Sequence, residues 1–341
     1  MIPRVTLYCE MYRPFNGWFY KGVGTGFITS YKNQKKILEK AGIFYTEDLN
    51  IPTNIFQANS HSPYTFYLLK KYKKQSKKII IYAHSTAEDL EKQFRVFHFI
   101  VPLLRWYLSK LYNFADAVAC PSEYTATLLN TKYGVSKEKT VFISNGVSLQ
   151  KFKFDQNRRD EFRNAKNISA DEIVVTNVAM ALKRKGLDTF IYLGKMFSNV
   201  RFAWFGKIFN ILLAPKIPPA TPNVTFRGYV PDIMEAYLSA DIFLFPSYEE
   251  QQGISVLEAG AMGLPILVRD IPVYYGWLVD GENCLKARNN DEFKEKLSNL
   301  LQESYLRKKL GSELHKLVVN EHSFESVGTK LNNLYEKLLK N

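Results

Sequence analysis

Cysteine is scarce in this 341-residue sequence, and motifs that hold metal ions are missing. The three cysteines, Cys9, Cys120 and Cys284, lie far apart and show no CxxC or zinc spacing. Such a sparse, odd set favours a reducing compartment, so the cytoplasm is the expected location. No HExxH sequence is present, and no two aspartates stand two residues apart. The sequence therefore predicts a protein that requires no metal.

Long apolar runs are missing too. The run from Val5 to Cys9 is too short for the core of a signal peptide. The longest uncharged apolar run in the middle of the chain, Val96 to Leu104, contains Pro102 and is flanked by arginines. A membrane-spanning helix needs about 20 apolar residues. We therefore expect a soluble or peripheral protein and not an integral membrane protein.

Acidic residues are few in the first half of the chain, where the positive charge collects. The net charge is +13. Residues 1–150 contain 20 Lys and Arg against 10 Asp and Glu, whereas residues 151–341 contain 26 against 23. This asymmetry indicates an anionic partner surface, either phospholipid head groups or nucleic acid. The alternative is a basic face that is simply solvated.

The chain does contain a regular alternation of short apolar runs and helical stretches, which is typical of parallel sheets with crossover helices. A polar segment, Lys151 to Asn167, interrupts the alternation and suggests a domain boundary. We expect an α/β fold of two facing doubly wound domains, 1–149 and 150–320, and a C-terminal helix, 321–341, that packs on the first domain. The expected strands are Val5–Cys9, Ile79–Ala83, Ala117–Cys120 and Val141–Ile143, then Ile173–Val178, Arg201–Phe205, Val224–Phe226, Ile242–Phe245 and Ile266–Val268.

The most informative stretch begins where the expected strand Ile242–Phe245 ends. Its loop carries Glu249 and Glu250, and a helix opens shortly after them. Unpaired backbone N–H groups at that helix start would bind an anion such as a diphosphate, because the helix dipole also favours negative charge there. Glu258, one to two turns into the helix, could accept from ribose hydroxyls. The alternative is a capped helix with two solvated acids. The N–H groups concerned belong to Gly253, Ile254 and Ser255.

Cations stand at the end of another expected strand. Lys183, Arg184 and Lys185 follow Ile173–Val178, and positive charge opposite the helix start suits a diphosphate. The alternative is a solvated run of charges.

A glycine-rich stretch, Lys21 to Gly26, precedes another expected helix. It differs from the dinucleotide-binding fingerprint, because residues 10–20 separate it from the strand that ends at Cys9 and Phe27 replaces the third glycine. Its glycines would instead let the backbone approach a bound group closely.

His84 directly follows the expected strand Ile79–Ala83, so it should face a cleft at the carboxyl ends of the strands. A structural histidine is the alternative.

Aromatic and basic residues alternate from Phe94 to Phe114, and six lysines precede them. Such a surface could hold anionic lipid. For the apolar face of this stretch, a buried core helix is the alternative. The predicted membrane contacts are Lys70, Lys71, Lys73, Lys74, Lys77, Lys78, Arg95, Arg105 and Trp106.

The combination of these motifs resembles the family 4 glycosyltransferases over nearly the whole chain. The motifs are Glu250 and Glu258 with seven residues between them, Gly253, Lys185-Gly186, the glycine-rich stretch and His84. Within that family the chain is most similar to glycolipid synthases of Gram-positive bacteria, which extend a glucosyl-diacylglycerol with a second sugar. The narrower resemblance is carried by His84–Asp89, Ser144–Gly146, Leu267–Tyr274, Trp277 and Asp280-Gly281.

The resemblance implies the GT-B fold of two facing Rossmann-like domains and a transfer that retains the anomeric configuration. It implies that UDP-galactose or UDP-glucose donates a hexose to a glycolipid such as glucosyl-diacylglycerol, without a metal cofactor. The implied location is peripheral, on the inner face of the plasma membrane, with an anionic membrane surface as partner.

The resemblance also implies roles for the site residues. Glu250 would contact the donor sugar at the reaction centre, and Glu258 would contact the ribose. His84 would lie by the sugar and assist the developing charge. The diphosphate would be held by Lys185 and Arg184 and by the backbone of Gly253, Ile254 and Ser255, with Gly24 and Thr25 closing over the donor.

Two positions depart from the family pattern. Met180 stands where many relatives carry an arginine, and Arg184 would supply that charge. Gln251-Gln252 replaces the usual Gly-Phe after the first glutamate, so the resemblance does not fix which hexose the donor carries. The choice between front-face attack and a covalent intermediate also stays open.

Other functions fit part of these features. A polysaccharide or protein acceptor would suit the same enzyme class. A nucleic-acid-binding protein would suit the charge, but it would leave Glu250, Gly253 and Glu258 unexplained, and the sequence has no RNP-like or helix-turn-helix signature. We therefore expect no nucleic-acid partner. The displaced glycine motif excludes a nicotinamide dehydrogenase.

Overall fold

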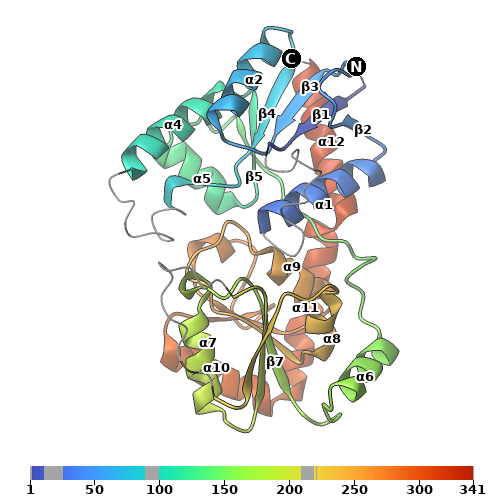
Figure 1. Cartoon of the computed structure of the whole chain (residues 1–341), viewed down its shortest axis with the longest axis vertical. Coiled ribbons are helices and arrows are strands. Elements are labelled where there is room, and N and C mark those ends of the chain that lie inside the picture. Colours follow the sequence, from blue (N-terminus) through green and yellow to red (C-terminus); the bar gives the residue numbers. More distant parts are fainter. Residues whose placement is uncertain (1, 11–25, 89–99, 209–218, 220, 341) are drawn as a thin grey trace.

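The computed structural model describes residues 2–10, 26–88, 100–208, 219 and 221–340. These residues form two lobes, one above the other in Figure 1, and each lobe is built around a six-stranded parallel sheet. This is the expected α/β arrangement of two Rossmann-like units.

The first lobe has the strand order β2-β1-β3-β4-β5-β6. Its strands are β1 Arg4–Tyr8, β2 Phe44–Thr46, β3 Ile55–Ala58, β4 Lys78–Tyr82, β5 Ala117–Cys120 and β6 Thr140–Phe142. The helices between them are α1 Gly26–Lys40, α2 Pro63–Lys73, α4 Val101–Phe114 and α5 Glu123–Lys132.

The second lobe has the strand order β12-β11-β10-β7-β8-β9. Its strands are β7 Val174–Val178, β8 Arg201–Phe205, β9 Val224–Gly228, β10 Ile242–Phe245, β11 Ile266–Arg269 and β12 Leu285–Ala287. Its helices are α6 Gln156–Ala165, α7 Leu187–Met196, α8 Met234–Ser239, α9 Ile254–Ala261, α10 Asn290–Gln302 and α11 Ser304–His322. Two short 3₁₀ helices, η3 Lys183–Lys185 and η4 Pro272–Tyr274, follow β7 and β11.

The strands form where apolar residues run without interruption, because helices cover the sheets and bury their strands. Ile79, Ile80 and Ile81 of β4 are all fully buried. Polar residues define where the helices start: the Ser62 hydroxyl caps α2, with proline in its first turn, and the Ser122 hydroxyl caps α5.

The nine expected strands are present, three with the expected bounds and six with ends shifted by one or two residues. The sequence pattern missed β2, β3 and β12, which are only three or four residues long. Each of the three contains a polar residue, Thr46, Gln57 or Lys286, so none forms an uninterrupted apolar run.

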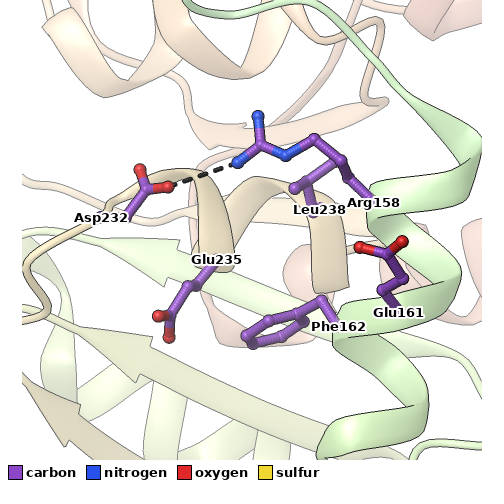
Figure 2. Close-up of a pocket in the computed structure, with 6 residues that line it drawn as sticks. All are labelled: Arg158, Glu161, Phe162, Asp232, Glu235 and Leu238. Atoms are coloured by element: carbon purple, nitrogen blue, oxygen red, sulfur yellow. Dashed lines mark hydrogen bonds and ion pairs between the residues drawn. The ribbon is translucent and has the colours of Figure 1, made fainter.

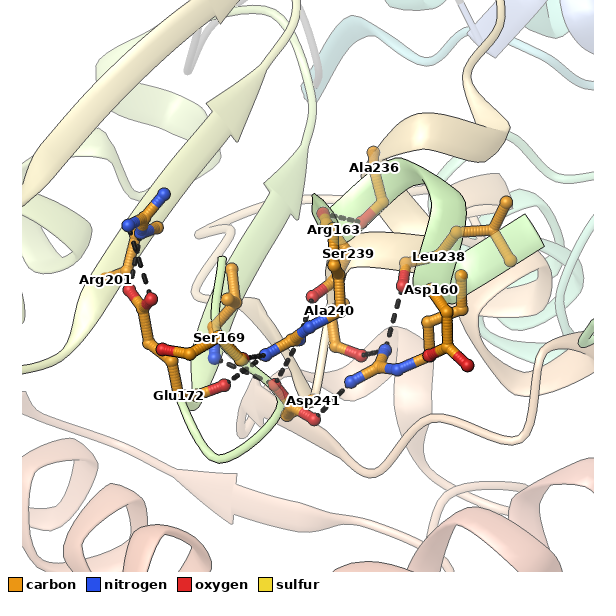
Figure 3. A network of polar contacts seen from close by, with 12 residues as sticks. Asp160, Arg163, Ser169, Glu172, Arg201, Ala236, Leu238, Ser239, Ala240 and Asp241 are labelled. Carbon is orange, nitrogen blue, oxygen red and sulfur yellow. Dashed lines mark hydrogen bonds and ion pairs between the residues drawn. The ribbon is translucent and has the colours of Figure 1, made fainter. Parts of the chain in front are cut away.

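The polar segment expected to break the pattern contains helix α6. Its charges hold it against the second sheet. Arg163 pairs with Asp241 at 3.1 Å (Figure 3). Arg159 pairs with the same carboxylate at 2.6 Å. Arg163 is 3% exposed and also donates to the carbonyl of Ser239 at 3.0 Å. A segment that is polar in composition is therefore anchored by partly buried ion pairs.

Helix α12, Phe324–Lys340, returns to the first lobe, and the C-terminus lies beside that lobe in Figure 1. Its buried face carries Phe324, Val327, Leu331 and Tyr335, which join the core formed by β1, β4 and α1. The chain thus crosses between the lobes twice, and the crossings run side by side, since the Val147 N–H donates to the His322 carbonyl at 2.9 Å.

Each sheet has one point at which the strand order reverses direction. These points lie between β1 and β3 in the first lobe and between β7 and β10 in the second. Ligands of such sheets bind at the carboxyl ends of the strands beside the reversal. The loops that follow β7 and β10 are therefore the place to look for a site.

Candidate active site

The loops after β7 and β10 are in contact at the reversal point of the second sheet. The Tyr248 N–H donates to the Arg184 carbonyl at 2.8 Å, and Arg184 Nη1 donates to the Glu249 carbonyl at 2.7 Å. The basic run of η3 and the acidic loop, which are about 65 residues apart in sequence, thus share one site.

Glu250 lies at the centre of this contact and is 8% exposed. Its carboxylate forms an ion pair with Lys185 and accepts from the Ser247 hydroxyl at 2.7 Å. Burial by itself would raise the pKa of Glu250, but the charges of Lys185 and Arg184 outweigh it and hold the pKa below its usual value. The carboxylate is therefore ionised at neutral pH.

Gly253 provides the sharp turn from this loop into α9. Its φ is +84°, a left-handed conformation that other residues rarely adopt, and an added Cβ would lie 3.1 Å from the Tyr274 hydroxyl. No side chain caps the N-terminus of α9. The backbone N–H groups of Ile254 and Ser255 in the first turn can therefore serve an anionic ligand.

Glu258 is buried inside α9, where it is 9% exposed. The Tyr237 hydroxyl donates to its carboxylate at 2.5 Å. Burial raises the pKa of Glu258 to about 7, against the opposing effects of the Tyr237 hydrogen bond and the charge of Lys151. This carboxyl therefore changes protonation state near neutral pH.

His84 follows β4 in the first lobe, as predicted. Its Nε2 lies 2.7 Å from Asn59 Oδ1, and its ring stacks on Tyr82 with 5.4 Å between centroids. Burial, together with the nearby His61, lowers the pKa of His84 to about 3. The imidazole is therefore neutral at physiological pH and can act through hydrogen bonds but not as a cation.

The structure brings the loops of His84 and Glu250 together across the two lobes. Gln251 Nε2 donates to the Thr86 hydroxyl at 3.4 Å, so the residue after Glu250 contacts a residue two positions after His84. The predicted residues Gly24 and Thr25 lie outside the described residues. Among the other predicted residues, Lys185 and Arg184 contact the Glu250 loop, which continues through Gly253, Ile254 and Ser255 to Glu258. His84 lies on the loop of the first lobe that Gln251 contacts through Thr86.

These residues coincide with regions that match known families. Residues 158–316 match the model described as "Glycosyl transferases group 1", and residues 52–151 match "Glycosyltransferase Family 4". The chain is also 32% identical over 326 residues to the processive diacylglycerol alpha-glucosyltransferase of Acholeplasma laidlawii, which covers 94% of each chain. The chain belongs to the family 4 glycosyltransferases.

Two further comparisons agree with this glycosyltransferase assignment. The chain is 27% identical over 330 residues to the alpha-galactosylglucosyldiacylglycerol synthase of Streptococcus pneumoniae, covering 93% of this chain and 87% of that one. The structure of HepE from Anabaena in complex with UDP-glucose superposes with a TM-score of 0.77 at 14% identity, covering 99% of this chain and 100% of that one. At that identity the second likeness shows the fold, GT-B.

Several residues of the glycosyltransferase site were not predicted as such. Tyr237 and Asn59, the partners of Glu258 and His84, carry no sequence signal, because their contacts depend on how α8 packs on α9 and how the end of β3 lies beside the end of β4. Gln251 and Gln252 did carry one, since they replace residues that the family pattern leads one to expect.

A surface groove of about 330 Å³ lies between α6 and α8 and contains none of the predicted site residues (Figure 2). Across it Arg158 pairs with Asp232 at 3.3 Å. Its lining is Arg158, Glu161, Phe162, Asp232, Glu235 and Leu238. A second cavity, of about 320 Å³, lies where the lobes meet, and Gln252 and His322 line it with Glu123 of the first lobe. Only this second cavity adjoins the Glu250 loop.

Among the described residues, no group of three or more His, Cys, Asp or Glu side chains is arranged to hold a metal ion. No helix in the described part of the chain is long and apolar enough to cross a membrane.

The predicted membrane residues fall into two groups. Lys70, Lys71, Lys74 and Trp106 are exposed, and Trp106 is 60% exposed. The others are engaged within the lobe: Lys73 pairs with Asp116 at 2.9 Å, Lys77 donates to Thr53 at 3.2 Å, Lys78 is half-buried in β4, and Arg105 pairs with Glu88 at 3.0 Å. Arg95 lies outside the described residues.

Proposed function

We propose that this glycosyltransferase moves a hexose from a UDP-sugar to a glycolipid such as glucosyl-diacylglycerol, with retention of configuration and without a metal. The second lobe would bind the donor, and the first lobe, residues 1–149, would take the acceptor and face the membrane. The observation that supports this most directly is the convergence of Glu250, Lys185 and the α9 N-terminus opposite His84. The diacylglycerol-dependent activities for which the Acholeplasma and Streptococcus relatives are named support the lipid acceptor.

The donor's diphosphate would lie between η3 and the start of α9. There Lys185, Arg184 and the backbone N–H groups of residues 253–255 supply fixed positive charge. When the bond between the anomeric carbon and UDP breaks, negative charge grows on the diphosphate. Groups that are already oriented offset that charge without reorganising, which lowers the barrier.

Glu250 and Lys185 neutralise each other in the structure. A diphosphate would compete for Lys185 and leave the Glu250 carboxylate available to the hydroxyls and the anomeric centre of the sugar. Glu258 would accept hydrogen bonds from the ribose, and the neutral imidazole of His84 would contact the transferred sugar.

The membrane side would be the exposed surface of α2 and α4, which pack together through the rings of Phe66 and Tyr107, 6.3 Å apart. Aromatic and apolar side chains stand out from it: Tyr67 is 60% exposed and Leu103 is 64% exposed. Lysines of α2 lie next to them. Aromatic rings combined with lysines suit the boundary of an anionic bilayer. We place the protein at the inner face of the plasma membrane.

The test is a transfer assay with vesicles that contain diacylglycerol or glucosyl-diacylglycerol, offered UDP-glucose or UDP-galactose separately. Mass spectrometry of the lipids detects the product. We expect a hexose to be added to glucosyl-diacylglycerol by wild-type protein and no such product in Glu250→Ala. Glu295→Ala, an equal loss of charge on the exposed face of α10, should leave the product unchanged. Hydrolysis of a UDP-sugar without any lipid product would contradict the lipid acceptor and point to a polysaccharide or protein.

A further inference from the structure

The loop that carries Glu250 reaches the first lobe through two consecutive glutamines. Gln251 Oε1 accepts from the Thr125 hydroxyl at 2.6 Å, and its Nε2 donates to the Thr86 hydroxyl at 3.4 Å. Gln252 Oε1 accepts from the Asn145 N–H at 2.8 Å, and its Nε2 donates to the Ser144 hydroxyl at 2.8 Å. Each amide therefore uses both its oxygen and its nitrogen across the lobes.

The partners of these glutamines are themselves held in place. Thr86 and Thr125 are fully buried, and the Thr125 hydroxyl lies 3.0 Å from Ser122, the N-cap of α5. Ser144 lies 2.8 Å from Nδ1 of His322. Because a buried hydrogen-bonding group is costly to leave unsatisfied, these contacts specify one position of the loop.

The two glutamines act at different places. Gln251 follows Glu250, and Thr86 stands two residues after His84, so this contact links the loops of the two candidate catalytic residues. Gln252 instead contacts the segment where the chain passes between the lobes, beside the returning crossing at His322.

We propose that Gln251 and Gln252 are positioning residues that hold the Glu250 loop in register with the His84 loop, so that transfer to the acceptor outcompetes hydrolysis of the donor. This inference rests on the proposed function. In both reactions the bond between the anomeric carbon and UDP breaks. In transfer, an acceptor hydroxyl forms the new bond and releases its proton, and in hydrolysis water does so. A loop that is out of register admits water in place of the acceptor.

The test is a double-mutant cycle of Gln251→Met and Thr125→Val. For each variant the lipid product measures transfer and the free sugar measures hydrolysis. We expect each single change to lower kcat for transfer about fivefold, the value of one net hydrogen bond, with little change in the KM of the UDP-sugar. The ratio of transfer to hydrolysis should fall in both. The double variant should be no worse than Gln251→Met, because that single change already removes the contact with Thr125.

Two matched variants separate positioning from folding. Thr125→Ser keeps the hydroxyl and should restore transfer, whereas Thr127→Val changes an exposed threonine on the same helix and should have no effect. Additive losses in the cycle, or an unchanged ratio of transfer to hydrolysis in Gln251→Met, would overturn the inference.

A second readout does not depend on the acceptor. If wild-type protein transfers to no lipid, the proposed function fails, but hydrogen–deuterium exchange at residues 249–253 still tests the contact. Exchange there should be faster in Gln251→Met and in Gln252→Met than in wild type. Exchange equal to wild type in both variants would refute the proposed positioning role.

Discussion

Glu250 lies on the loop before α9 and Glu258 lies within α9, yet their surroundings shift the pKa values of the two carboxyls in opposite directions. Glu250 faces two cations, which hold its pKa below the usual value. Glu258 has the hydroxyl of Tyr237 as its close partner, and burial raises its pKa to about 7. Paired carboxyls with separated pKa values commonly take separate roles. The separation is consistent with Glu250 at the sugar and Glu258 at the ribose.

Replacing Glu258 with Gln should raise the KM for the UDP-sugar about tenfold, as expected when a charged acceptor of a hydrogen bond is replaced by a neutral one. In wild type, lowering the pH from 8 to 5.5 protonates Glu258 and should raise the donor KM. In Glu258→Gln the KM should not follow this trend. Initial rates at varied donor concentration across that pH range give both quantities.

The same ionisation provides a stability control. Because the folded-state pKa lies above the ordinary 4.5, the folded protein binds more protons than the unfolded chain between about pH 4.5 and 7. Wild-type stability should therefore be favoured below this window and decline as the pH rises through it. Glu258→Gln should lack this decline, measured by urea unfolding at pH 5.5 and pH 8. The same change in unfolding free energy between pH 5.5 and pH 8 in both proteins would contradict a raised pKa of Glu258.

At the scale of elements, the site depends on how closely η3 approaches the loop after β10. Gly186, which ends η3, has a φ of +79°, and an added Cβ would lie 2.2 Å from the carbonyl oxygen of Pro246. The close approach of the Gly186 backbone to Pro246 brings Lys185 beside Glu250. Only glycine permits both the backbone conformation and the contact.

Gly186→Ala should therefore destabilise the protein by more than about 1 kcal/mol, since an alanine is strained where φ is positive, and it should weaken donor binding by separating the two loops. Urea unfolding and UDP titration measure the two effects. Gly281→Ala is the matched control, because its φ is also +79° but no atom lies within 4 Å of the added Cβ. Equal loss of UDP affinity in both variants would show that the contact is unimportant.

Helix α6 shows what the composition of residues 151–167 did not reveal. The sequence pattern placed a break at residues 151–167 because the segment is polar, but two of its arginines are directed at Asp241. Charged residues within a helix read as exposed unless their partners are known, and Asp241 lies 78 residues from Arg163.

At the scale of the whole molecule, the excess positive charge of the first half lies mainly on α2 and its surroundings. Lys70, Lys71 and Lys74 are exposed next to Tyr64 and Tyr67, whose rings stack with 6.1 Å between centroids. An exposed group of lysines and aromatic rings on one helix surface favours a membrane surface over a random solvated face.

Replacing Lys70, Lys71 and Lys74 with Ala should weaken binding to anionic vesicles about a hundredfold, at about 1 kcal/mol for each lysine near the surface. The binding should also weaken as salt is added. Vesicle sedimentation at two ionic strengths measures both. The control removes Lys294, Lys308 and Lys309, three exposed lysines of α10 and α11. An equal loss in the control would mean that only total charge matters.

The sequence by itself determined the two sheets and the strand ends at which the candidate site residues lie. Parallel strands end at one edge of a sheet, so Lys185, Glu250 and His84 could be assigned to strand ends from the local pattern alone. The resemblance of the motifs then implied the family that the comparisons confirmed.

The tertiary structure decided which groups these residues meet. Arg105, a predicted membrane contact, pairs with Glu88, and Gln251, a departure from the family pattern, bonds to Thr125, 126 residues away. Local periodicity reports which face of an element a residue occupies, whereas its partner depends on how distant elements pack. For that reason the sequence indicated where the site lies, and the packing of the two lobes decided how its loops are held together.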